Sequence, residues 1–186
     1  MIPSGRIVAC DPFIAGGEPF RRSLAPGSYP LALAVAQIDT DSRIAFAIVR
    51  FAATAAAAWE PASIVQNSSN QENDVPESYG VDSATGCFCN PAVLKTIHEC
   101  FEADIGFSEL LSSKMNSTAV TTRSWLHLSS PVGSAALFTS GYGDGRYSSY
   151  FGIDAKQNTV ALVTDFGVVN WPPGSRETGP VIRPNR

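Results

Sequence analysis

The sequence predicts an α+β fold, made mainly of antiparallel β-strands with one helical pair inserted near the middle, at about residues 91–116. Apolar residues recur at helical spacing in this one region, and short apolar runs bounded by turn residues occupy much of the remaining chain. Parallel strands need a crossover connection, usually a helix, between successive strands. One helical region cannot supply those crossovers, so the strands are expected to pair antiparallel.

The N-terminal part is expected to contain three strands. Residues 5–10 form a short apolar run, and residues 31–38 and 43–51 flank a polar turn, which predicts a hairpin. Both faces of these two longer runs are apolar, so we expect both strands to be covered on both sides. Residues 52–58 are small, and they fit either a strand extension or a helical turn.

The helical pair follows a polar segment. Residues 66–78 contain almost no apolar side chain, which predicts a loop. Asn90 and Pro91 are typical of an N-cap and a first helical residue, and the apolar spacing after them predicts a helix to about Asp104. A second short helix is expected to end near Asn116.

Four further strands are expected after the helices, at residues 121–128, 134–140, 146–154 and 159–166. We therefore predict a single globular α+β domain over residues 1–170 and a proline-rich C-terminal tail over residues 171–186.

The composition argues against some classes of partner. The chain has a net charge of -4, with 44% hydrophobic and 16% charged residues. A nucleic-acid-binding protein usually needs a basic patch, and only Arg21 and Arg22 are adjacent. No apolar run has the length of a membrane span, and the first residues do not resemble a signal peptide. We expect a soluble, cytoplasmic protein that binds neither nucleic acid nor membrane.

The segment 140–147 is the first candidate for a functional site. Gly141, Gly143 and Gly145 alternate with other residues around Asp144, and tyrosines and phenylalanine follow. Glycine adopts positive φ angles at no steric cost, so the backbone here is expected to bend sharply and to present the Asp144 carboxylate. An elaborate hairpin turn is the alternative explanation.

Aromatic side chains near this segment could line a ligand cleft. Tyr147 and Phe151 share one face of the expected strand and should belong to the core, whereas Tyr150 lies on the other face and should be exposed. Tyr142 and Trp125 are further candidates for the lining of a cleft, because aromatic residues are enriched in binding surfaces.

Three aspartates next to glycine or aromatic residues are candidates for chemistry. If the carboxylates of Asp82, Asp144 and Asp165 converge, they could bind Mg²⁺ or Ca²⁺. Aspartates at strand ends also cap turns, which is the alternative. The chain contains no standard catalytic motif, so we expect no cofactor and leave open whether the protein is an enzyme.

Four cysteines allow two interpretations. Cys87 and Cys89 have C-x-C spacing, and on a strand we expect them to point to opposite faces. Buried free thiols are the expected state. Alternatively, Cys87 just before a helix could act as a nucleophile with His98 or His127 as its base.

The order of five segments resembles an uncharacterised bacterial family, known only as the domain of unknown function DUF4241. These segments are residues 5–12, 26–30, 79–88, 140–147 and 164–166. The family pattern has glycine where this chain has Ala84, so the turn there is expected to differ. The resemblance implies a single domain and no established activity, and it transfers no catalytic role.

Three functions remain open. The first is a non-catalytic binding or protein-interaction domain, with a protein or a small molecule as its ligand, that uses the Gly/Tyr-rich loop. The alternative is a small hydrolase or metal-dependent enzyme with clustered aspartates, and the third is a subunit whose apolar surface is buried in an oligomer. The candidate residues are Asp82, Cys87, Tyr142, Asp144, Arg146, Tyr150 and Asp165.

Overall fold

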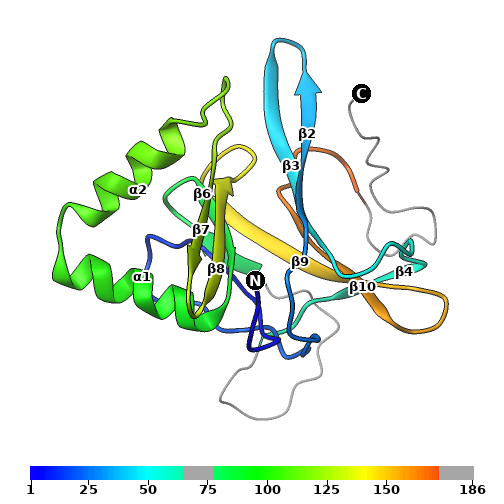
Figure 1. Cartoon of the computed structure of the whole chain (residues 1–186). Helices are drawn as coiled ribbons and strands as arrows, with labels where there is room; N and C mark the ends of the chain where they lie inside the picture. The colour runs from blue at the N-terminus through cyan, green and yellow to red at the C-terminus, as the bar shows by residue number, and fades with distance from the viewer. Residues whose placement is uncertain (65–77, 172–186) are drawn as a thin grey trace.

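Two antiparallel sheets and a helical pair build the protein (Figure 1). The computed structural model describes residues 1–64 and 78–171. Helices α1 (Pro91–Ala103) and α2 (Phe107–Asn116) lie between the strands in sequence, and every strand pairing is antiparallel among the described residues. The predicted α+β class and the helical pair are therefore confirmed.

The larger sheet has six strands. Five strands follow the order β2-β3-β10-β9-β4. The sixth, β5, lies off this path and pairs with β9, as β4 does. The strands are β2 (Leu31–Ile38), β3 (Asp41–Arg50), β10 (Thr159–Asp165), β9 (Gly145–Ile153), β4 (Ala58–Pro61) and β5 (Ser78–Val81). Strand β2 therefore forms one edge of this sheet.

The smaller sheet has four strands in the order β1-β6-β8-β7. They are β1 (Val8–Cys10), β6 (Thr85–Cys89), β8 (Gly133–Thr139) and β7 (Trp125–Ser130). Figure 1 shows α1 and α2 on the side of this sheet that faces away from the larger sheet. Strand β7 forms its edge, so each sheet presents one longer edge strand.

The predicted hairpin is confirmed, but the two strands differ in burial. Residues 44–49 of β3 are all buried, because they pack into two apolar clusters, one with Ile44, Ala47 and Val49 and the other with Ala45, Phe46 and Ile48. The residues of β2 are only half-buried or exposed. The prediction that both strands are covered on both sides is therefore wrong for β2, because the face with Leu31, Leu33 and Val35 lines an open cleft.

The helices begin and end close to the predicted residues. The Asn90 side chain accepts a hydrogen bond from the Ala92 amide at 3.0 Å, and Pro91 follows as the first helical residue. Helix α1 buries an apolar face against the smaller sheet. The buried residues of the two helices are Val93, Leu94, Ile97, Leu111 and Met115.

A core of aliphatic and aromatic side chains fills the space between the sheets. Phe138 of β8, which is fully buried, has edge-on ring contacts with Phe88 and Phe166 at 5.6 and 6.0 Å. Tyr147 and Phe151 are buried in the same cluster, as predicted for their face of β9.

Three short strands were not predicted. Residues 52–57 form neither a strand nor a helical turn, and β4 begins only at Ala58. Strands β5 and β6 fall between the predicted loop and the predicted helix, where no element was expected. The expected loop at 66–78 lies outside the described residues except for Ser78, and the expected tail lies outside them except for Trp171.

Candidate functional site: a cleft between the sheets

A cleft of about 620 Å³ opens between the edge strands β2 and β7. Clefts of a few hundred cubic ångströms with mainly apolar walls are typical of ligand sites. Residues of β2 and β3 line one wall and residues of β7 and β8 line the other. The lining consists of Tyr29, Leu31, Leu33, Val35, Ile44, Arg123, Trp125, Leu126, His127, Ala136 and Leu137.

The cleft exposes large apolar side chains beside a few polar ones. Val35 is 42% exposed and Trp125 is 43% exposed, whereas Ile44 and Leu137 are buried. Arg123 and His127 add a cation and an imidazole to the wall formed by the smaller sheet. The prediction that Trp125 lines a ligand cleft is consistent with its place here.

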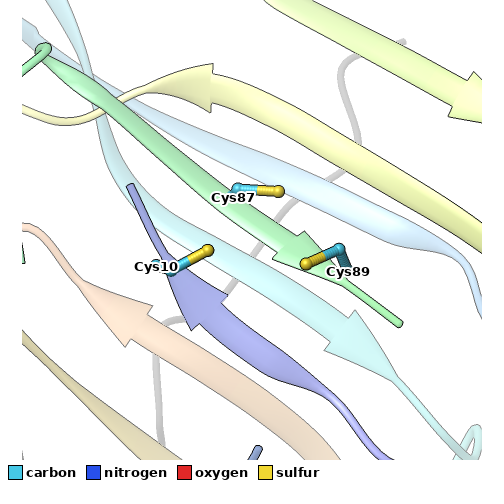
Figure 2. A group of neighbouring side chains, drawn as sticks. All are labelled: Cys10, Cys87 and Cys89. Atoms are coloured by element: carbon cyan, nitrogen blue, oxygen red, sulfur yellow. The ribbon is translucent and has the colours of Figure 1, made fainter. Parts of the chain in front are cut away.

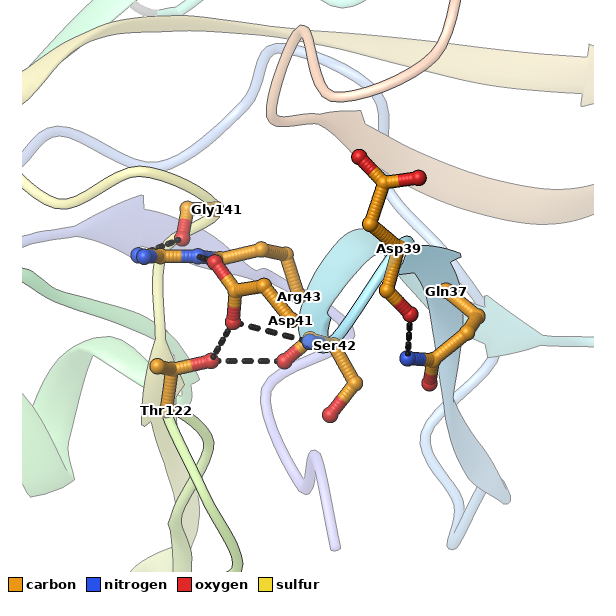
Figure 3. Close-up of polar contacts among 7 residues, drawn as sticks. All are labelled: Gln37, Asp39, Asp41, Ser42, Arg43, Thr122 and Gly141. Atoms are coloured by element: carbon orange, nitrogen blue, oxygen red, sulfur yellow. Dashed lines mark hydrogen bonds and ion pairs between the residues drawn. The ribbon is translucent and has the colours of Figure 1, made fainter.

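A polar network joins the two sheets next to this cleft (Figure 3). Arg43 of β3 donates to the Asp41 carboxylate at 2.6 Å and to the Gly141 carbonyl at 3.3 Å. The Thr122 hydroxyl donates to the Asp41 carboxylate or to the Ser42 carbonyl. Since Arg43 precedes Ile44 and Thr122 precedes Arg123, this network fixes residues adjacent to both walls of the cleft.

The Gly/Tyr-rich loop takes part in the network through its first residues. The Arg43 guanidinium lies over the Tyr142 ring, 5.2 Å from its centre. Such cation–π contacts contribute about 0.5–1 kcal/mol at exposed sites. Tyr142 is 60% exposed, so it presents an aromatic surface whose orientation Arg43 helps to fix.

The network sets a pH dependence. The hydrogen bond from Arg43, with further bonds from Thr122 and the Ser42 amide, lowers the pKa of Asp41 from 3.8. A carboxyl whose pKa is lower in the folded state stabilises the fold above its unfolded pKa, and this stabilisation is lost as pH falls through the folded value. We expect Asp41→Asn to lose less stability than the wild type between about pH 5 and pH 2. Urea unfolding midpoints across this range measure the difference.

Asp39→Asn is the matched control for this prediction. It removes the same charge two residues away, and Figure 3 shows the Asp39 carboxylate pointing away from Arg43 and Thr122. The control should follow the wild-type pH dependence. If Asp41→Asn also follows it, the network does not contribute to acid stability.

The three candidate aspartates do not form a common site. Among residues 1–64 and 78–171, their carboxylates do not form a group with ligand atoms close enough to share one metal ion. Asp144 accepts the Ala84 amide at 2.9 Å, and Asp165 accepts the Gly167 amide at 2.8 Å. Asp165 therefore caps its own turn, as the alternative interpretation stated, whereas Asp144 holds the turn at Ala84, 60 residues before it.

Asp82 contributes to a turn through its backbone. Its side chain is exposed, and its amide donates to the buried carboxylate of Asp11. Ala84 has a φ of 52°, a left-handed conformation that favours glycine. Asp82 and Asp11 also line a second pocket of about 410 Å³ beside β1 and β5.

The remaining candidates have structural contacts. Arg146 donates to the Ser78 carbonyl at 2.9 Å and to the Ser78 hydroxyl at 3.0 Å, which holds β5 against β9. Tyr150 is half-buried and contacts the Trp171 ring edge-on at 5.3 Å. The expectation that Tyr150 is exposed is therefore wrong, because Trp171 and its neighbours cover this face of β9.

The cysteine prediction needs one correction. Cys87 and Cys89 lie on the same face of β6, because side chains two residues apart on a strand point the same way. Both are free and buried, as expected for packed thiols, and Cys10 of β1 lies beside them (Figure 2). Cys87 is fully buried and burial raises the pKa of its thiol, so the structure argues against the nucleophile hypothesis.

The comparisons with known proteins identify a family. The model of the family described as a protein of unknown function, DUF4241, matches residues 1–164. The chain belongs to this family. No curated protein and no solved structure matched the chain.

The DUF4241 match includes both walls of the cleft and all of the candidate residues except Asp165. The sequence analysis missed most of the cleft, in particular the face formed by the half-buried Leu31 and Leu33 and the exposed Val35. The alternation of these three apolar residues is visible in the sequence, but it is equally typical of a strand that faces the core. No helix in the described part of this DUF4241 chain is long and apolar enough to cross a membrane.

Proposed function

We propose that this DUF4241 chain is a non-catalytic protein-interaction domain that binds an extended, apolar segment of another polypeptide in the cleft between β2 and β7. The observation that supports this most directly is the position of an apolar cleft beside two strand edges. Neither β2 nor β7 has a second strand partner among the described residues.

An unpaired strand edge favours a peptide over a small molecule as the ligand. The outward amides and carbonyls of β2 can pair with an added strand, which gives affinity through the main chain. Alternate side chains of such a strand would then enter the cleft and meet Leu31, Leu33 and Val35. Apolar side chains are favoured there, because Trp125 and Val35 lose exposed apolar area on binding.

The Gly/Tyr-rich loop supports this function through its contacts with Arg43. Its Gly141 carbonyl and Tyr142 ring hold Arg43, and Arg43 holds Asp41 at the turn of the β2–β3 hairpin. In this proposal the loop fixes the hairpin relative to the smaller sheet. The aspartate-based enzyme has less support, since Asp144 and Asp165 hold turns.

Selection of binders from a random peptide library, followed by affinity measurement, tests the proposal. We expect selected peptides to alternate apolar and polar residues and to protect β2 amides from hydrogen exchange. Val35→Lys should lower their affinity about tenfold, or 1.4 kcal/mol, because it places a charge in the apolar cleft. The matched control is Val132→Lys, since Val132 is equally exposed (44% against 42%) and lies outside the cleft.

Three outcomes would contradict the proposal. These are selected peptides that bind Val35→Lys as tightly as the wild type, an equal loss in both lysine variants, and protection confined to residues outside β2 and β7. Light scattering on the unliganded chain distinguishes peptide binding from the oligomer hypothesis. If the chain is a dimer and Val35→Lys dissociates it, the partner of β2 is a second copy of the chain.

A further inference from the structure

Three buried cysteines form a cluster that the proposed binding function does not use. Cys10 of β1 lies directly opposite Cys87 of β6, and Cys89 is two residues further along the same face. The three Sγ atoms lie within 4.8 Å of one another (Figure 2). The exposed fractions are 5% for Cys10, 0% for Cys87 and 2% for Cys89. Two strands thus bring three thiols to one enclosed point.

We propose that Cys10, Cys87 and Cys89 bind one thiophilic d¹⁰ cation, Cu(I) or Zn(II), with three thiolates as ligands. Soft thiolate ligands select these ions, and metal sites need donor atoms that already converge. The C-x-C spacing is unusual for zinc sites in loops, where two or more residues separate the ligands. On a strand, however, C-x-C points both sulfurs the same way, and the facing strand supplies the third.

A nitrogen near the cluster offers a fourth ligand. His98 lies on α1 directly after Ile97, which packs in the same apolar cluster as the three cysteines. Within the described part of the chain, Nε2 of His98 is buried without a hydrogen-bond partner. A buried polar atom of this kind needs an explanation, and a missing ion is one.

The two ions make different demands on this donor set. Cu(I) is satisfied by three thiolates in a plane, whereas zinc in a structural site takes four ligands, for which Cys₃His is a known set. The ring nitrogens of His98 do not belong to the group of ligand atoms that lie within 4.8 Å of one another. The His98 ring would therefore have to move toward the sulfurs to bind zinc. The role of His98 therefore distinguishes the two ions.

The surroundings favour a metal that is held away from water. Val8, Leu94 and Leu137 belong to the apolar cluster around the sulfurs. The loop at Gly16 and Gly17 covers Cys10 closely, since a Cβ atom on Gly17 would lie 3.1 Å from the Cys10 Cβ. The same loop and Cys10 line the 410 Å³ pocket, so this pocket reaches one residue of the cluster.

Titration of the full, reduced, metal-free chain tests the proposal. We expect one equivalent of Cu(I) or Zn(II) to bind in competition with a chromophoric chelator, and to raise the thermal unfolding temperature. X-ray absorption on the wild-type complex should show three sulfur neighbours. This measurement needs no variant, so it holds even where a core substitution prevents folding.

Substitutions then assign the ligands. Cys87→Ala and Cys89→Ala should each lower the affinity at least a hundredfold, whereas Cys100→Ala, which removes the half-buried cysteine outside the cluster, should not change it. His98→Ala should lower the affinity for zinc and leave that for Cu(I) unchanged if the site is a three-coordinate copper site.

Several results would overturn the proposal. A folded chain with reduced thiols that binds neither ion at one equivalent would reject it, as would binding that persists in Cys87→Ala and Cys89→Ala or that disappears in Cys100→Ala.

Tight zinc binding that His98→Ala leaves unchanged would reject His98 as the fourth ligand and would retain the three-thiolate site.

Discussion

Asp11→Ala should lower the free energy of unfolding by about 3 kcal/mol, because one buried carboxylate organises the turn between β5 and β6. Asp11 is 3% exposed. Its oxygens accept the amides of Asp82 and Ser83 at 2.9 and 2.8 Å, the Ser83 hydroxyl at 2.7 Å and the Phe13 amide at 2.9 Å. A hydrogen bond to a charged group contributes about 1.5–3 kcal/mol, and a buried donor left without its acceptor costs about 1–3 kcal/mol. Because these bonds form one network, their losses do not simply add.

Urea unfolding of Asp11→Ala measures the loss, and Asp82→Ala is the matched control. Asp82 takes part in the network through its amide, and its side chain is exposed, so this control should stay within about 0.5 kcal/mol of the wild type. Asp11→Asn keeps one acceptor oxygen and should fall between the two. A loss below 1 kcal/mol in Asp11→Ala, or an equal loss in Asp82→Ala, would show that the carboxylate does not hold the turn.

Local patterns in the sequence predicted the long elements well. The polar turn between two apolar runs indicated the β2–β3 hairpin, and Asn90 with Pro91 marked the start of α1 almost to the residue. These signals are local, because a turn residue or a helix cap acts on amides a few positions away. Strands β4, β5 and β6 were missed, since β4 and β5 are four residues long and β6 contains Gly86 and two cysteines.

The candidate site was less predictable because its contacts are long-range. Asp11 bonds amides more than seventy positions away, and Asp144 bonds an amide sixty positions before it. Nothing in the residues next to either aspartate shows whether its carboxylate meets a metal or an amide. The cleft likewise requires β2 and β7 to lie on different sheets, and a pattern of alternating leucines does not specify the partner surface.

The second large loss of stability is expected from substitution of Gly141, in the Gly/Tyr-rich loop. Its φ is 47°, and a Cβ atom there would lie 2.8 Å from the Phe166 Cβ and 3.0 Å from the Phe166 carbonyl oxygen. A left-handed conformation costs a residue with a side chain about 1–2 kcal/mol. Contact with a backbone oxygen adds to this cost, because the backbone at Phe166 pairs with Ala45 of β3 and cannot move freely. We expect Gly141→Ala to lower the free energy of unfolding by about 3 kcal/mol.

Gly80→Ala is the control for Gly141→Ala. Gly80 lies in β5 with nothing within 4 Å of its added Cβ, and its φ lies outside the positive range, so the change should be neutral or slightly stabilising. Unfolding in urea compares the two variants. If Gly141→Ala folds with wild-type stability, the glycine is not needed for the close approach to Phe166. A destabilised Gly141→Ala that still folds should also bind selected peptides more weakly, because the Gly141 carbonyl accepts Arg43 and Arg43 holds the hairpin beside the cleft.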